Sequence, residues 1–479
     1  MAANYDVALT ASIVNVLENP INRKRQLLSL YELLVRDFNV LREAVRTDLQ
    51  WTDDVAIEAI NQVLGAIEAV YPDISLADEL EVEQKLSAGT RIEHIEQPLS
   101  LTLIIGSGQN PLGSTLLPLV GALAAGSVSI IVQPERTDKT SSTLSTILSQ
   151  AVDHEGVQTV PASALDKLLR NRFDAVVVPP SYDPKAIRQL QSVNAAIRVL
   201  QPGSGLVAAI VDRSADLYSA SVQIRNAFWK NESGKLFGGP KIVFVDEFVL
   251  DDLQEHLRDR QKGFTTRRPT KSSAKPASNV LRISTRDQAP TITSPAPSPL
   301  TAASVKELLR DTSIAKDSIL IVPTTSTGHT LDMLNLLIGD KVAPAVYVFS
   351  TGPEVSFFSR FLRSQVTIAN SIPPWALVNW IPQSPNATSI VPFAPRDFTN
   401  NHPVVQFEPI KKESTQVRSL PKKAVLKMDK RRETGLKLSF FERGIIIGGI
   451  GLLVGTPGAI YAITRGFRAL YPAISSRFS

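Results

Sequence analysis

The stretch QPLSLTLIIGSGQNPLGSTLLPLVGALAAGSVSIIVQPER, residues 97–136, decides the fold class. Two short runs in it, 101–106 and 127–133, are rich in Leu, Ile and Val and are continuously apolar rather than alternating. Continuous apolar runs bounded by Gly, Pro or Asp are typical of parallel strands that are buried on both faces. The stretch therefore predicts a strand, a loop, a helix and a second strand, in that order.

The same alternation continues along the chain, where helical stretches such as 137–150 and 163–172 separate further apolar runs. Predicted strands lie at 173–179, 205–212, 241–247, 318–325, 345–351 and 365–370, and predicted helices at 302–309, 330–337 and 353–364. Strands that alternate with crossover helices build a doubly wound parallel sheet. The fold class predicted from these residues is α/β.

Residues 8–70 have helical periodicity, because apolar side chains such as Leu28, Tyr31, Leu34 and Phe38 recur three and four positions apart. This pattern predicts a helical hairpin that caps the core. By contrast, residues 263–300 are rich in Ser, Thr, Pro and Ala, with six basic residues and only Asp287 acidic. A segment with so few large apolar groups cannot offset the entropy of ordering, so we expect it to be disordered.

The 479 residues include no Cys and five His, and their net charge is only +5. The absence of Cys excludes disulfides, thiolate nucleophiles and thiolate metal sites within these residues. The histidines are far apart, so we expect no metal site; they are His94, His154, His256, His329 and His402. The basic excess is local and lacks interleaved aromatic residues, which argues against nucleic-acid binding.

Residues 444–464 contain no charged side chain, and Arg443 and Arg465 flank them. Such a run is long enough to cross a bilayer as one helix. Small residues spaced alternately four and three apart fall on one face of that helix, where they favour close helix packing: Gly444, Gly448, Gly451, Gly455 and Gly458. A buried core helix in a protein without a membrane anchor is the alternative.

Residues 411–437 hold ten basic and three acidic residues, so this segment would be attracted to anionic lipid beside a membrane helix. The N-terminus lacks the pattern of a secretory signal. We therefore expect a C-terminal tail anchor with a cytosolic domain. The sequence does not choose among the endoplasmic reticulum, the mitochondrial outer membrane and the peroxisome.

Residues 97–136, with the run PLVGALAAG, resemble the start of the cofactor domain of aldehyde dehydrogenases, particularly the class 3, fatty-aldehyde type. The segments 172–181, 199–217 and 342–350 resemble later parts of the same family. The resemblance implies a doubly wound Rossmann-type domain plus a reduced second α/β domain, here followed by one transmembrane helix.

In that family a Cys thiolate attacks the aldehyde, hydride passes to a nicotinamide, and a Glu activates the water that hydrolyses the thioester. The resemblance places Phe237 at the Cys position and Gln201 at the Glu position. The Asn that stabilises the oxyanion falls on Gln109, with Asn110 next to it. Ser233 lies near the nucleophile position but has no evident base, so no catalytic residue is predicted.

The family's cofactor contacts are also altered. The Lys and Glu that bind the adenosine ribose are replaced by Gln133 and Arg136, although Arg136 could meet a ribose phosphate instead. The phosphate-binding Gly-Ser-Thr turn is replaced by residues 179–184, PPSYDP, which include Ser181. Its prolines remove N–H donors and its lack of Gly blocks a close backbone approach. The sequence therefore predicts no cofactor.

These changes lie at the positions of chemistry, whereas the apolar pattern of the scaffold persists. The function predicted is that of a membrane-anchored pseudoenzyme that acts through protein binding or oligomerisation. Its partner would be a second copy or a related dehydrogenase. The alternative is an active NAD(P)-dependent fatty-aldehyde oxidoreductase with a non-standard site.

The predicted organisation has eight parts. They are N-terminal helices (1–96), a Rossmann-like domain (97–235), a second α/β domain (236–262 and 301–370), a disordered insert (263–300), a return segment (371–410), a basic linker (411–442), a membrane helix (443–464) and a basic tail (465–479).

Overall fold

The computed structural model describes residues 2–88, 94–179, 182–201, 205–230, 238–258, 281–284, 291–293, 302–310, 318–378 and 393–403. The remaining residues include most of the predicted disordered insert, the predicted linker, membrane helix and tail, and the five glycines of the predicted packing stripe. Among the described residues, no helix is both long enough and apolar enough to cross a membrane.

The N-terminal part is helical, as the periodicity predicts. Its helices are α1 (Ala2–Val14), α2 (Pro20–Arg36), α3 (Phe38–Leu49), α4 (Asp53–Val70) and α5 (Leu76–Ser87). The predicted hairpin is too simple, because the backbone at Asp37 leaves helical geometry between α2 and α3. Leu28, expected on the apolar face, is 43% exposed.

The stretch quoted first folds in the predicted order. It forms β2 (Leu101–Ile105), α6 (Pro111–Ala125) and β3 (Val128–Val132). Asn110 caps α6, Pro111 occupies its first turn, and Gly126 ends it with a φ of 92°. This arrangement of Pro at the start and Gly in left-handed geometry at the end is typical of helix termini.

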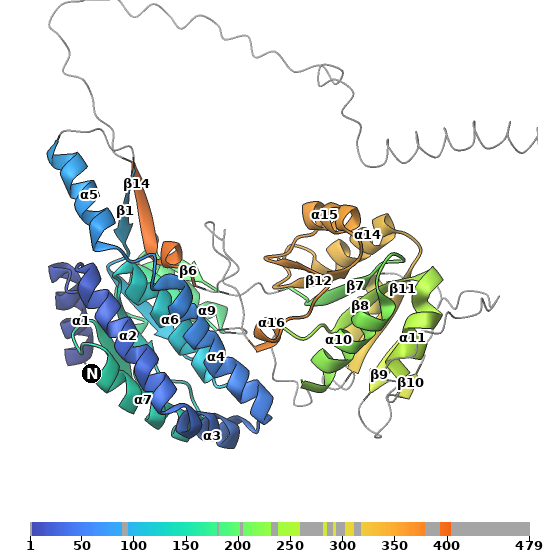
Figure 1. Cartoon of the computed structure of the whole chain (residues 1–479), viewed down its shortest axis with the longest axis horizontal. Coiled ribbons are helices and arrows are strands. Elements are labelled where there is room, and N and C mark those ends of the chain that lie inside the picture. Colours follow the sequence, from blue (N-terminus) through green and yellow to red (C-terminus); the bar gives the residue numbers. More distant parts are fainter. Residues whose placement is uncertain are drawn as a thin grey trace, which may run out of the picture. The chain divides into compact units, whose positions relative to one another are not determined.

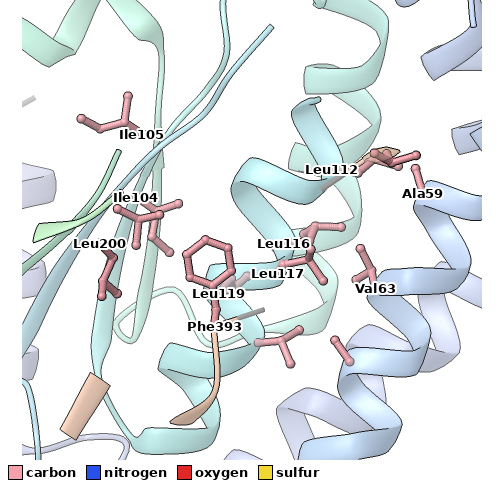
Figure 2. Packing of buried hydrophobic residues seen from close by; sticks show 14 of the residues in the cluster. Ala59, Val63, Ile104, Ile105, Leu112, Leu116, Leu117, Leu119, Leu200 and Phe393 are labelled. Carbon is pink, nitrogen blue, oxygen red and sulfur yellow. The ribbon is translucent and has the colours of Figure 1, made fainter. Parts of the chain in front are cut away.

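The five-stranded parallel sheet has the order β4-β3-β2-β5-β6. Its further elements are α7 (Asp138–Ala151), β4 (Val157–Val160), η1 (Ala162–Ala164), α8 (Leu165–Leu168), β5 (Ala175–Val177), α9 (Pro184–Val193) and β6 (Arg198–Leu200). Helix α6 is buried along its whole length between the strands and α4, with Leu112, Leu116 and Leu117 near Ala59 and Val63 (Figure 2). A helix that is apolar all round requires such a position.

A second, seven-stranded sheet has the order β10-β9-β11-β8-β7-β12-β13. Its elements are β7 (Ala208–Val211), α10 (Leu217–Lys230), β8 (Ile242–Asp246), η2 (Glu247–Val249), α11 (Leu250–Arg258), β9 (Leu281–Ser284), β10 (Thr291–Thr293), α12 (Ala302–Arg310), β11 (Ser318–Thr324), α14 (Thr327–Ile338), β12 (Val346–Phe349), α15 (Gly352–Phe361), β13 (Thr367–Ala369) and α16 (Pro374–Val378). Along each central strand, alternate residues point to opposite faces of the sheet. One face packs against α10 and α11, and the other packs against α12, α14 and α15. Covering both faces explains the continuous apolar runs.

Two predicted boundaries are wrong. Strand β7 was assigned to the first domain, but it pairs with β8 and β12 in the second sheet. Strands β9 and β10 lie within the segment predicted to be disordered, and β9 pairs antiparallel with β11. Backbone hydrogen bonds to an existing sheet stabilise these short strands despite their polar composition.

The return segment brings the chain back to the first sheet. It contains η3 (Pro395–Phe398) and β14 (Thr399–Pro403), which pairs antiparallel with β1 (His94–Pro98). Arg198 fixes this return by donating to the carbonyls of Asp397 and Thr399. Figure 1 shows β1 and β14 side by side.

Candidate functional site

The carboxyl edge of the five-stranded sheet is the first candidate site. The chain proceeds from β2 to β3 and β4 on one side and then to β5 and β6 on the other. The topological switch point therefore lies between β2 and β5, the place where doubly wound sheets bind ligands. The loops after Ile105 and Val177 begin at this point, and the loop after Val132 begins beside it at the end of β3.

The loop after β2 lies against the loop after β3. A Cβ added to Gly106 would come within 2.8 Å of the Val132 carbonyl oxygen, and one on Gly108 within 2.8 Å of the Glu135 carbonyl oxygen. The neighbouring Ser107 donates its backbone N–H to the Ser114 hydroxyl at 2.8 Å. Glycines are therefore required here because the two backbones approach closely.

The oxyanion position of the family resemblance is structural in this chain. Gln109 is exposed in the turn, whereas Asn110 is 8% exposed. The Asn110 Oδ1 accepts the backbone N–H of Gly113 at 2.9 Å, and its Nδ2 donates to the Val378 carbonyl at 2.8 Å. The Asn110 amide thus caps α6 and holds α16, as expected of a helix-start residue.

The two residues that the family resemblance assigns to ribose binding, Gln133 and Arg136, follow the end of β3. The Gln133 side chain donates to the hydroxyl of Ser145 and to the carbonyl of Ser141, so its amide is tied to α7. Arg136 is exposed and has a φ of 60° in the turn before α7. Both residues thus follow β3 as predicted, and of the two only Arg136 is exposed to solvent.

The start of α9 occupies the phosphate position of the resemblance. The Asp183 carboxylate accepts the backbone N–H of Lys185 at 2.9 Å, and Pro184 has no N–H to offer. Burial, together with the nearby Asp166 and Asp183 carboxylates, raises the pKa of Tyr182 to about 12. Any anion at this helix start would face a carboxylate. Ser181, the remaining candidate of this turn, lies outside the described residues.

The general-base and nucleophile positions are described only in part. Gln201 follows β6 and is exposed, while Phe237 and Ser233 lie outside the described ranges. The next residue, Gly238, is held tightly. Its carbonyl accepts the Tyr347 hydroxyl at 2.8 Å, and its N–H donates to the Leu377 carbonyl.

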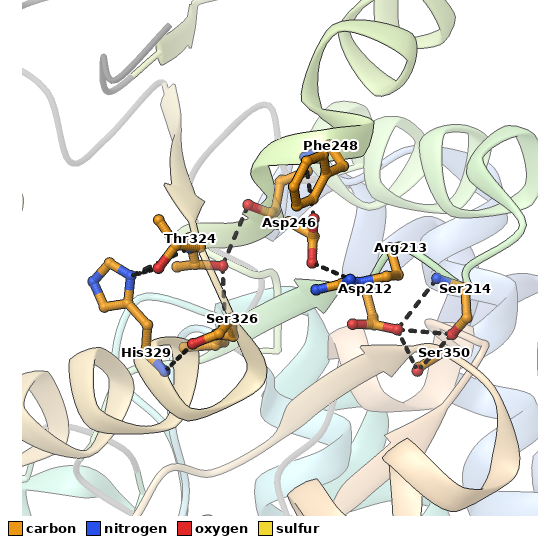
Figure 3. Close-up of polar contacts among 12 residues, drawn as sticks. Asp212, Arg213, Ser214, Asp246, Phe248, Thr324, Ser326, His329 and Ser350 are labelled. Atoms are coloured by element: carbon orange, nitrogen blue, oxygen red, sulfur yellow. Dashed lines mark hydrogen bonds and ion pairs between the residues drawn. The ribbon is translucent and has the colours of Figure 1, made fainter. Parts of the chain in front are cut away.

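The carboxyl edge of the seven-stranded sheet carries a polar network that the sequence analysis missed (Figure 3). Asp212 follows β7 and is 7% exposed. Its carboxylate accepts the hydroxyls of Ser214 at 2.8 Å and Ser350 at 3.2 Å. Asn370, after β13, accepts the Ser350 N–H and donates to the Ser350 carbonyl. The only sequence signal for this network is that Asp212, Ser350 and Asn370 each lie at or next to the carboxyl end of a predicted strand.

A second part of this edge joins β8 and β11. Asp246 pairs with Arg213 at 3.2 Å and accepts the N–H of Phe248. The Thr330 hydroxyl donates to Thr324, whose hydroxyl donates to the Val245 carbonyl. These bonds satisfy buried polar groups and tie strand ends together, so the network is structural.

No family model matches the chain. The curated relatives include the dimeric NADP-preferring aldehyde dehydrogenase of Mus musculus, with 24% identity over 50% of this chain and 54% of the relative. Aldehyde dehydrogenase family 3 member A2 of Rattus norvegicus is 25% identical over 50% of this chain and 51% of the relative. The matches thus span about half the length of these relatives.

Solved structures extend the likeness to most of the fold. Substrate-bound AldH of Staphylococcus aureus has a TM-score of 0.62 and 17% identity, and the match covers 86% of this chain and 95% of that chain. The chain is thus similar to aldehyde dehydrogenases in sequence over about half its length and in fold over most of it. Class 3 members are among its relatives, as the residues 97–136 predict.

The comparison with these relatives contradicts the prediction that the chain has no cofactor. The Mus musculus relative is named for its preference for NADP. The NADP complex of glyceraldehyde-3-phosphate dehydrogenase GapN from Methanocaldococcus jannaschii has the same fold, with a TM-score of 0.59, 14% identity, and coverage of 84% of this chain and 93% of that chain. That prediction rested on the changed residues at the ribose and phosphate positions, whereas the five-stranded sheet and its switch point are retained.

Proposed function

We propose that this aldehyde-dehydrogenase-like chain does not oxidise aldehydes by the thioester route and acts instead through protein binding or self-association. The absence of Cys from all 479 residues carries this proposal. The thioester route requires a new bond between the aldehyde carbon and a sulfur atom, and hydride then leaves that carbon for the nicotinamide. Without a thiol that bond cannot form, whatever dinucleotide is bound.

The geometry around Asn110 supports the proposal. An oxyanion donor must have a free N–H aimed at the reacting oxygen. The Asn110 amide instead donates to the Val378 carbonyl, and the adjacent Gln109 is exposed in a turn. The Asn110 side chain therefore stabilises the start of α6 and its contact with α16.

The proposed function includes anchoring to a membrane through residues 443–464, with the folded part in the cytosol. The uncharged run between Arg443 and Arg465 supports this part of the proposal. Comparing the membrane fraction of cells that express the full chain or a chain lacking residues 440–479 tests it. An equal membrane share for both proteins would contradict the anchor.

The test of the proposed loss of activity uses the purified full chain with a long-chain aldehyde and NAD or NADP, followed at 340 nm. We expect no reduction of the nicotinamide above the rate without protein. Iodoacetamide provides the control, because alkylation blocks contaminating thiol dehydrogenases but cannot act on a chain without Cys. Aldehyde-dependent reduction that survives alkylation would show an active oxidoreductase with a non-standard site.

A further inference from the structure

Helix α2 presents a line of apolar side chains to solvent. Ile21, Leu28 and Val35 are 58%, 43% and 50% exposed. They are seven residues apart, and seven residues make almost two helical turns, so the three side chains lie along one face. Single exposed apolar residues are ordinary, but three in one line form an apolar stripe along the helix that a second helix can cover.

The opposite face of α2 is occupied. Leu27, Leu30 and Leu34 are fully buried, and α2 contacts α4, α6 and α7. Figure 1 shows α2 beside α7 in the helical part of the chain. The exposed line is therefore not an unfinished part of the core, and none of the described residues of the chain covers it.

Charged residues beside the line identify that partner. Arg25 and Glu32 each lie four residues after an apolar position of the line, and their charges are opposite. In an antiparallel pair of α2 helices centred on Leu28, Leu28 meets Leu28 of the second copy and Ile21 meets the second copy's Val35. The same pairing brings Arg25 of each copy next to Glu32 of the other.

We propose that the exposed line of α2 pairs antiparallel with the same line on a second copy of this chain. The surface is self-complementary under a two-fold axis, which is the requirement for a symmetric dimer. Apolar residues meet in the middle, and two Arg25–Glu32 pairs flank them and fix the direction of pairing. This inference rests on the proposed function, in which the chain acts by binding, and supplies a surface for it.

The existing contacts of these residues permit the pairing. The Arg25 guanidinium donates to the Asn22 side chain at 2.6 Å and lies 3.5 Å from Asp153, yet 69% of its side chain is exposed. Glu32 is exposed. A single helix seam buries little area, so we expect an association that depends strongly on protein concentration.

The natural lack of Cys allows a direct test in the full chain. Leu28→Cys places one thiol on the two-fold axis, where two copies come within disulfide reach. Leu336→Cys is the matched control, because Leu336 is 63% exposed on α14, away from the proposed seam. Under mild oxidation we expect the covalent dimer to form at least about tenfold faster with Leu28→Cys. Equal rates for the two variants would overturn the proposal.

Charge reversal tests the register independently of the thiol. In the Leu28→Cys background, Arg25→Glu alone or Glu32→Arg alone places like charges opposite each other and should slow cross-linking about tenfold. A mixture of the two variants restores both opposite-charge pairs and should recover the original rate as a mixed dimer. Thermal unfolding confirms that each variant is folded, and failure of the mixture to recover refutes the pairing.

The aldehyde assay on the same preparations separates the two proposals. Cross-linking with the expected pattern, together with nicotinamide reduction, would leave the α2 seam intact and refute the proposed loss of activity. The absence of selective cross-linking, together with no reduction, would refute the seam alone.

Discussion

Replacing Asn110 by Ala removes two hydrogen bonds of a buried amide. The loss of the cap on α6 costs about 1 kcal/mol. The Val378 carbonyl, which accepts from Asn110 at 2.8 Å, would lose that donor, and an unsatisfied buried group costs about 1–3 kcal/mol. We therefore expect Asn110→Ala to lower the free energy of unfolding by about 2–4 kcal/mol.

The neighbouring Gln109 provides the matched control, since it is exposed in the same loop. Gln109→Ala should change the free energy of unfolding by less than about 0.5 kcal/mol. Asn110→Asp separates the two contributions, because a carboxylate can still cap α6 but cannot donate to the Val378 carbonyl.

Urea unfolding followed by circular dichroism measures the stability, and amide hydrogen exchange of residues 111–125 and 374–378 localises the effect. We expect faster exchange in both ranges for Asn110→Ala and only in the second for Asn110→Asp. If Asn110→Ala is no less stable than Gln109→Ala, the structural role assigned to Asn110 is wrong.

Three further predictions concern the rest of the fold. Gly65→Ala, in an open helical position of α4, should stabilise the chain by about 0.5–1 kcal/mol. Gly121→Ala in α6 should destabilise it by about 1–3 kcal/mol, because a Cβ would lie 2.1 Å from the Phe393 carbonyl oxygen. Thermal unfolding of the two variants tests both signs. Asp183→Asn keeps an acceptor at the start of α9 but removes its charge, so calorimetry with inorganic phosphate should show an affinity about two- to fivefold higher than for the unchanged chain; an unchanged or lower affinity would contradict the role given to the Asp183 carboxylate at this helix start. The pKa of Tyr182 is about 12 in the folded chain and about 10 in the unfolded chain, so its contribution to stability is complete below pH 10 and is lost between pH 10 and 12. In Tyr182→Phe, the unfolding temperature should therefore decrease less over that pH range.

Local pattern was sufficient for much of the fold. The runs that became β2, β3, β7 and β8 are rich in Val, Ile, Leu and other apolar residues, and burial on both faces of a parallel strand favours that composition. The lack of Cys was equally plain from composition, because no tertiary arrangement can supply a thiol that these residues do not contain.

The candidate sites depended on contacts that the sequence does not encode locally. Ser350 reaches the Asp212 carboxylate across 138 positions of the chain, and nothing in either local stretch marks the pair. Asn110 was expected at a helix start, but its bond to the Val378 carbonyl spans 268 positions.

The sequence by itself determined most of the buried strands and the helices between them, the resemblance to aldehyde dehydrogenases, and the absence of a thiol. The tertiary structure decided that β7 joins the second sheet, that β9 forms a strand at all, and that Leu28 faces solvent. The physical reason is the range of the interactions. Side-chain periodicity acts over a few residues, whereas strand partners and exposed faces are set by hydrogen bonds and packing between distant segments.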